Sequence, residues 1–190
     1  MGHPSVRLPM AEDLRIRRYE SGDADAVWEL HERAMRDAGT DPADLPGTDD
    51  LRRVREAYVE TGGDFVVGVL EGEGDPAETD GDPLQVGDGT LVAMGGFLPC
   101  EEGHAEERSV EGAAELHRMR VAPDHQRKGY GRRILAALER RAREAGYELL
   151  LATTASRQRS AVRFYPDEGY VETGRSTHGE YELIHFEKRL

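Results

Sequence analysis

The sequence contains little cysteine and no long hydrophobic run. Cys100 is the only cysteine among 190 residues, which excludes an intramolecular disulfide and a cysteine-rich zinc site. Every hydrophobic run is shorter than the roughly 20 residues that a membrane-spanning helix needs, and the N-terminus lacks the apolar segment of a secretion signal. We therefore expect a cytoplasmic protein with no membrane partner.

Lysine is also scarce, although charge is abundant. The net charge is −13, and only two of the 25 basic residues, Lys128 and Lys188, are lysines. This acidity argues against nucleic acid as a partner. An acidic, arginine-rich composition is typical of a halophilic or GC-rich source, in which the carboxylates form a solvated surface; the alternative is a surface that attracts cations. The histidines show no metal-binding spacing such as H-E-x-x-H, so no metal site is predicted.

The length suits one domain. We expect residues 1–12 to be an N-terminal extension or tag remnant and residues 13–190 to form a single domain. Two acidic segments, residues 71–89 and 101–111, have no face that could pack and are predicted to be solvated loops.

Apolar periodicity predicts the element order β-α-α-β-β-β-α-β-α-β-β. The predicted strands are residues 14–19, 64–70, 90–98, 113–121, 147–154, 170–173 and 180–188. The predicted helices run from Ser21 or Asp23 to Ala38, from Asp49 or Asp50 to Gly62, and over residues 132–145 and 158–165.

The strand at residues 113–121 departs from regular alternation. Its apolar order is Leu116, Met119, Val121, with one residue too many between the first two. An extra residue in one strand of a pair predicts a β-bulge, and bulges often re-aim groups beside active sites.

A glycine-bearing turn, residues 126–131, joins this strand to the next helix. Backbone N–H groups at a helix N-terminus bind phosphate groups, and glycine lets the backbone approach closely. The run is not a Walker A loop, and it lacks the third glycine of a dinucleotide fingerprint. It therefore predicts a phosphate or pyrophosphate site of another kind.

Gln126, Gly129 and Gly131 match the Q/R-x-x-G-x-G/A loop of the GCN5-related N-acetyltransferases (the GNAT family), which hold the pyrophosphate of acetyl-coenzyme A. Downstream, Ala161, Phe164 and Tyr165, followed by the pair Gly169-Tyr170, resemble the family's A-x-x-F-Y…G-F/Y segment. The two motifs occur in the family's order.

The resemblance implies an α/β (α+β) fold with a mixed, mostly antiparallel, seven-stranded sheet and four helices. The strands on either side of the phosphate loop would be parallel and splayed to admit acetyl-CoA. Met119 and Val121 would bond its pantetheine arm through the backbone, and Gln158 stands where many members have a cofactor-contacting asparagine. The remaining expected cofactor contacts are Gln126, Arg127, Lys128, Gly129, Tyr130, Gly131, Arg132 and Phe164.

The family also suggests catalytic residues. Tyr165 lies where a general acid is often found, although Pro166 is expected to end its helix early. Glu115 occupies the position of a general base that acts through water, and His117 is an alternative base. Residues 40–48, Tyr58 and the last two strands would shape the acceptor pocket.

These features predict an acetyl-CoA-dependent N-acetyltransferase that acts on a primary amine of a small molecule or peptide by direct attack. Two alternatives stay open: a protein N-terminal acetyltransferase, of ribosomal proteins for example, and a non-catalytic acyl-CoA-binding sensor. The sequence also leaves a homodimer open.

Overall fold

The computed structural model describes residues 14–39, 48–71, 84–87, 89–100 and 110–190. The predicted N-terminal extension, most of the two acidic segments and most of the predicted acceptor loop at residues 40–48 lie outside these ranges. Within the described part of the chain, no helix is long and apolar enough to cross a membrane.

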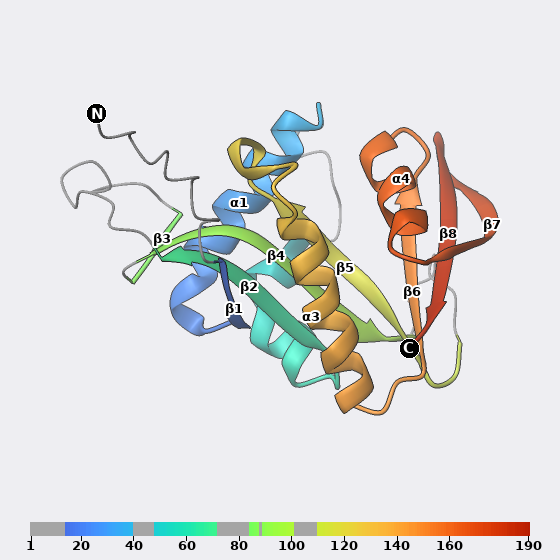
Figure 1. The fold of residues 1–190 in the computed structure, drawn as a ribbon, viewed down its shortest axis with the longest axis horizontal. Helices are drawn as coiled ribbons and strands as arrows, with labels where there is room; N and C mark the ends of the chain where they lie inside the picture. The colour runs from blue at the N-terminus through green and yellow to red at the C-terminus, as the bar shows by residue number, and fades with distance from the viewer. Residues whose placement is uncertain (1–13, 40–47, 72–83, 88, 101–109) are drawn as a thin grey trace, which may run out of the picture.

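The strands form one twisted, mixed sheet (Figure 1). Seven of them follow the order β1-β2-β4-β5-β6-β8-β7, and β3 pairs with β4 beside that path. This confirms the predicted seven-stranded, mostly antiparallel sheet and adds β3 inside a segment predicted to be a loop. The strands are β1 (Leu14–Arg18), β2 (Asp64–Glu71), β3 (Gln85–Val86), β4 (Gly89–Pro99), β5 (Ala113–Val121), β6 (Leu149–Ala155), β7 (Val171–His178) and β8 (Tyr181–Arg189).

In the described ranges, three α-helices cover the sheet: α1 (Ala24–Asp37), α3 (Tyr130–Glu144) and α4 (Arg159–Asp167). α3 crosses one face, and α1 lies behind the opposite face (Figure 1). An ion pair between Arg132 and Glu168 links α3 to the end of α4. The core therefore has two layers, one between α3 and the sheet and one between the sheet and α1.

The predicted second helix is not continuous. It consists of a 3₁₀ turn, η3 (Thr48–Arg52), and a π-helical turn, η4 (Arg55–Val59). Asp50 explains the interruption, because its carboxylate accepts hydrogen bonds from the N–H of Leu51 and from the hydroxyl of Tyr58. The segment is thus held by side-chain bonds that a regular helix would not place together, and π turns are frequent at functional sites.

β5 and β6 are parallel neighbours only where they begin. Ala113, Ala114 and Glu115 pair with the first three residues of β6, and no further pairs follow. Beyond that point, the pairing of β5 with β4 shifts register between Met94 and Gly96, and Arg118 has a φ of 56°. The predicted bulge and the predicted splayed pair are both confirmed, since the bulge bends β5 away from β6.

The expectation that Pro166 would end α4 early is wrong. The helix continues to Asp167 with the proline inside it. The N–H groups of Glu168, Gly169 and Tyr170 bond back to the carbonyls of Phe164, Pro166 and Tyr165 respectively. The ring of Tyr165 also packs against Tyr170 and Phe186 at 5.5 Å between centroids. Core packing here outweighs the local preference of a residue before proline.

Candidate active site

The predicted cofactor residues gather where β5 separates from β6. Met119 and Val121 both face α3: a Cβ built on Gly95 would lie 2.6 Å from Met119 Sδ, and one on Gly131 would lie 3.7 Å from Val121 Cγ2. A side chain at position 95 would collide with Met119, so glycine is required opposite the bulge. The sequence pattern had not indicated this requirement for glycine. β5 thus presents these two residues beside the start of α3.

The glycine-bearing loop turns sharply into α3. Gly129, with a φ of 84°, is the residue before the helix, and Arg127 also has a positive φ, of 60°. The first N–H groups of a helix lack intrahelical partners and form a site for an anion. A Cβ on Gly131 would meet Val121 and Phe164 only at ordinary contact distances of 3.7 to 3.9 Å, so this glycine is not required by the protein's own packing. These features fit the pyrophosphate of a nucleotide cofactor.

The other predicted cofactor residues differ in what they contact. Tyr130 is buried and stacks on His125 at 6.2 Å between ring centroids, so its ring belongs to the core. Gln126 donates to Asp37, and the Gln158 amide oxygen accepts from Thr154 Oγ1 at 2.7 Å. Arg127 and Lys128 are exposed in the loop. The loop residues therefore lie together at the start of α3, and the side chains of Gln126 and Tyr130 make contacts within the protein.

Tyr165 is buried, with 7% of its surface exposed. Burial raises the pKa of its phenol to about 12; nearby Arg120 opposes this rise and Glu115 adds to it. The phenol therefore keeps its proton at neutral pH. Both of these charged residues lie on β5, so the strand's charges act on the phenol.

Glu115 occupies the last paired position before the opening and is buried. Thr153 Oγ1 donates to its Oε1 at 2.7 Å and lies 3.2 Å from His185 Nδ1. His185 Nε2 lies 2.8 Å from Ser176 Oγ, and Ser176 is exposed. Hydrogen bonds thus run from the buried carboxylate across β6, β8 and β7 to the surface.

The face of β5 that points away from α3 carries a set of polar residues that the sequence pattern had not indicated. Arg118 donates to both carboxylate oxygens of Asp50, at 2.9 and 3.0 Å, and Tyr58 donates to the same carboxylate at 2.5 Å. Burial disfavours the charge of Arg118, but Asp50 outweighs this and raises the pKa of the guanidinium. Burial first, and Asp50 second, raise the pKa of Tyr58. The predicted alternative base, His117, lies edge-on to Tyr58.

Arg120 and His31 complete this face. The guanidinium of Arg120 donates one hydrogen bond, from Nη1 to the carbonyl of Met119 at 2.8 Å, while its Nε is buried without a partner among the described residues. His31, on α1, is fully buried, and neither ring nitrogen has a hydrogen-bond partner there. Burial, followed by the charges of Arg120 and Arg118, lowers the pKa of His31 to about 4, so it is neutral at pH 7.

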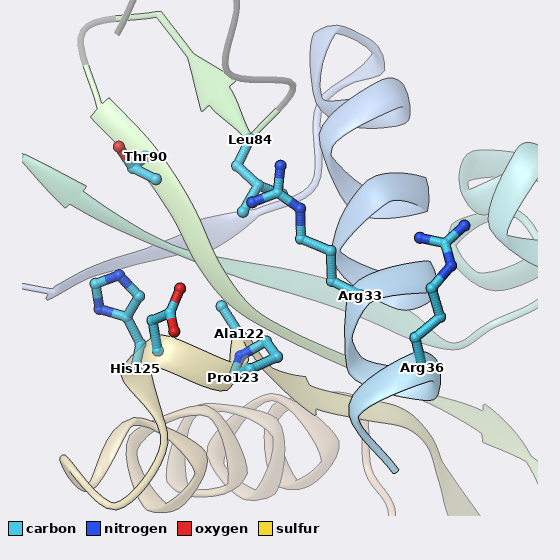
Figure 2. Close-up of a pocket in the computed structure, with 8 residues that line it drawn as sticks. Arg33, Arg36, Leu84, Thr90, Ala122, Pro123 and His125 are labelled. Carbon is cyan, nitrogen blue, oxygen red and sulfur yellow. The ribbon is translucent and has the colours of Figure 1, made fainter. Parts of the chain in front are cut away.

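A cavity of about 320 Å³ lies nearby, between α1, β4 and the turn before the loop (Figure 2). Arg33 and Arg36 reach it from α1, and Thr90 reaches it from β4. No predicted catalytic or cofactor residue lines it, so we do not assign it to the active site. Its full lining is Arg33, Arg36, Leu84, Thr90, Ala122, Pro123, Asp124 and His125.

Solved structures share this fold. An acetyltransferase of the GNAT family from Staphylococcus aureus superposes with a TM-score of 0.71 at 14% identity, covering 93% of this chain and 99% of that one. The structure of yncA from Salmonella typhimurium, solved with its cofactor acetyl-CoA, has a TM-score of 0.64 at 21% identity and covers 93% of each chain. A ribosomal-protein-alanine N-acetyltransferase from Brucella melitensis has a TM-score of 0.67 at 18% identity, covering 93% of this chain and all of that one.

Sequence comparison agrees with the fold. Human N-acetyltransferase 8 is 28% identical over 86 residues, which span 45% of this chain and 36% of that protein. The profile described as the acetyltransferase (GNAT) family matches residues 25–170, from α1 to the residue that precedes β7. The chain therefore belongs to the acetyltransferase (GNAT) family.

Proposed function

We propose that the protein transfers the acetyl group of acetyl-CoA to a primary amine by direct attack, in the cytoplasm. The observation that carries this proposal is the opening between β5 and β6. It has a glycine-bearing helix N-terminus on one side, and a buried carboxylate and a buried phenol close to it. A donor held there would lie between a base and an acid, as acyl transfer to an amine requires.

The chain's own residues fit the donor in two ways. The backbone of β5 at Met119 and Val121 does not pair with β6, so its edge on that side can pair with an extended amide-bearing arm, although the Met119 carbonyl already accepts one hydrogen bond from Arg120. The turn at Gly129 and the start of α3 provide N–H groups for a pyrophosphate. When bound, acetyl-CoA supplies an activated thioester carbonyl.

Glu115 would act as the general base. An amine must lose a proton to become acetylated, and a carboxylate within reach, directly or through one water, can accept it. Thr153 orients this carboxylate through its hydrogen bond to Oε1. The hydrogen bonds onward to His185 and exposed Ser176 give the accepted proton a route to solvent.

Tyr165 would supply the proton that the departing thiolate needs. Its pKa of about 12 keeps Oη protonated at the moment of reaction. Ring-to-ring contacts with Tyr170 and Phe186 fix the position of its side chain. A positioned acid of this kind contributes about 10²- to 10⁴-fold to a rate.

Two other functions stay as candidates. The likeness to a ribosomal-protein-alanine N-acetyltransferase favours a protein N-terminus as the acceptor. A non-catalytic sensor would use the same loop to bind an acyl-CoA without using Glu115 or Tyr165.

Thiol release from acetyl-CoA with a panel of small amines and N-terminal peptides tests the proposal. We expect turnover with small amines that depends on Glu115. Turnover with peptides alone would favour the N-terminal acetyltransferase. Tight binding of acetyl-CoA with no turnover would favour the sensor, and failure to bind acetyl-CoA at all would overturn the assignment of the cofactor site.

A further inference from the structure

Two arginines lie on the α1 side of β5, beside one carboxylate that is already engaged. Arg118 and Arg120 both lie there, and Asp50 meets Arg118 in a two-point ion pair. Asp50 also accepts a hydrogen bond from the hydroxyl of Tyr58. Its oxygens are therefore committed, and the second arginine has no carboxylate in hydrogen-bond contact among the described residues.

That second arginine is Arg120. Its Nη1 bonds a neutral backbone carbonyl, and its Nε is buried with no acceptor in the described part of the chain. Burial and the like charge of Arg118 both lower the pKa of the guanidinium. A partly buried charge without a counter-ion costs stability, and features that cost stability are kept where function needs them.

The direction of Arg120 separates it from the pyrophosphate site. Successive side chains of a strand point to opposite faces, and its neighbours Met119 and Val121 face α3. Arg120 therefore faces α1, where its charge acts on His31. An anion held here would not be the pyrophosphate at the start of α3.

His31 adds a second group of the same kind. Both of its ring nitrogens are buried without partners in the described ranges, yet one of them carries a hydrogen when the ring is neutral. A carboxylate beside Arg120 would accept hydrogen bonds from the guanidinium fork and from this ring N–H. It would also supply the missing negative charge.

We propose that Arg120 and His31 bind a carboxylate of the acceptor, so that the substrates are small amines that carry a carboxylate, such as amino acids. This inference rests on the proposed acetyltransferase function and names its substrate class. A protein N-terminus has a peptide bond where a free amino acid has its carboxylate, so the inference selects against protein acceptors.

Matched pairs of acceptors test this preference. Glycine, β-alanine and 4-aminobutyrate would each be compared with their amides, by thiol release from acetyl-CoA. An amide has the lower amine pKa and hence more of the reactive neutral form, so a preference for the acid would reflect recognition. We expect kcat/KM for at least one acid to exceed that of its amide by on the order of 100-fold.

Arg120→Met should remove this preference, whereas Arg120→Lys should keep part of it. Arg140→Met is the matched control, because it removes the same charge from an exposed position on α3 and should leave the preference unchanged. Equal rates for acids and amides, or a preference that survives Arg120→Met, would overturn the inference while amine turnover still upheld the proposed function. A preference for 2-aminoethylphosphonate over β-alanine would overturn the assignment to a carboxylate.

Thermal unfolding provides a readout that does not depend on turnover. Without ligand, Arg120→Met should unfold at the same temperature as the wild type or higher, because the variant removes a partly buried charge that has no ion pair among the described residues. Propionate should raise the unfolding temperature of the wild type more than that of Arg120→Met. A lower unfolding temperature for Arg120→Met, with an unchanged response to propionate, would show a structural role and overturn the inference.

Discussion

The two sides of β5 are built in different ways. On the α3 side, the proposed cofactor half would use backbone groups and glycines from one continuous stretch, residues 119–132. On the α1 side, the proposed acceptor half would use charged and polar side chains drawn from α1, η3, η4 and β5. A binding site made of backbone groups can be encoded by one short segment. A cluster of charged side chains needs residues that are distant in the sequence.

Glu115 is the proposed general base, so its variant should have the largest effect. Glu115→Gln keeps the size of the side chain and its acceptor for Thr153 but removes the base. We expect kcat to fall by about 10³-fold, within the range for general base catalysis, with little change in acetyl-CoA affinity. Steady-state rates and calorimetry would measure these two quantities.

His117→Gln is the matched comparison for the predicted alternative base. A larger loss of kcat for His117→Gln than for Glu115→Gln would transfer the role of base to the histidine.

The local structure on the α3 side of β5 could be predicted from the sequence because its signals are contiguous. The glycine spacing at Gly129 and Gly131 predicted the turn into α3, and the apolar spacing from Leu116 to Met119 predicted the bulge. The roles of the individual loop residues stay predictions, since their predicted ligand is a separate molecule.

The acceptor half could not be predicted in the same way. The partners Arg118 and Asp50 are separated by 68 positions, and no local pattern links them. Local rules also failed where tertiary contacts were stronger: Asp50 interrupts the predicted second helix, and packing of Tyr165 carries α4 through Pro166. Nothing in the local sequence distinguishes His31 from an ordinary buried helix residue, because the arginines that act on it lie on a strand distant in the sequence.

The acceptor half should have its own pH dependence of stability, through His31. Its pKa is about 4 in the folded protein and about 6.5 in an unfolded chain. Between these values the unfolded state binds a proton that the native state does not, so stability is complete above pH 6.5 and is lost as the pH falls towards 4. The loss over the whole window should reach up to about 3 kcal/mol.

His31→Leu isolates this contribution from that of the carboxylates. Because the ring nitrogens of His31 have no hydrogen-bond partners in the described structure, the variant loses no hydrogen bond and should be less sensitive to acid than the wild type. Urea unfolding at pH 7 and pH 5 measures the difference. Equal acid sensitivity of the two proteins would mean that His31 is not held neutral by burial and the two arginines.

Tyr165→Phe should lower kcat by about 10²-fold while leaving acetyl-CoA affinity nearly intact. Because the phenol has a pKa of about 12, it stays protonated up to about pH 11, so any loss of wild-type activity between pH 7 and pH 10 comes from another group. The variant should therefore keep the shape of the wild-type pH profile in that range. Tyr170→Phe is the control: its hydroxyl bonds Glu139 on α3, so its loss should affect stability rather than kcat.

Gly131→Val tests the cofactor half alone and should have the smallest effect. A Cβ at this position meets only ordinary contacts within the protein, so the ligand-free fold should be preserved and any loss must come from the approach of the pyrophosphate. Acetyl-CoA affinity should weaken by about 2 kcal/mol, the value of a lost charge-assisted hydrogen bond. Calorimetry should place Gly131→Ala between the wild type and the valine variant, whereas Arg120→Met should bind acetyl-CoA as the wild type does. If Gly131→Val bound normally and Arg120→Met did not, the division between the two sides of β5 would be wrong, because the donor would then be held by side-chain charge on the α1 side rather than by the loop.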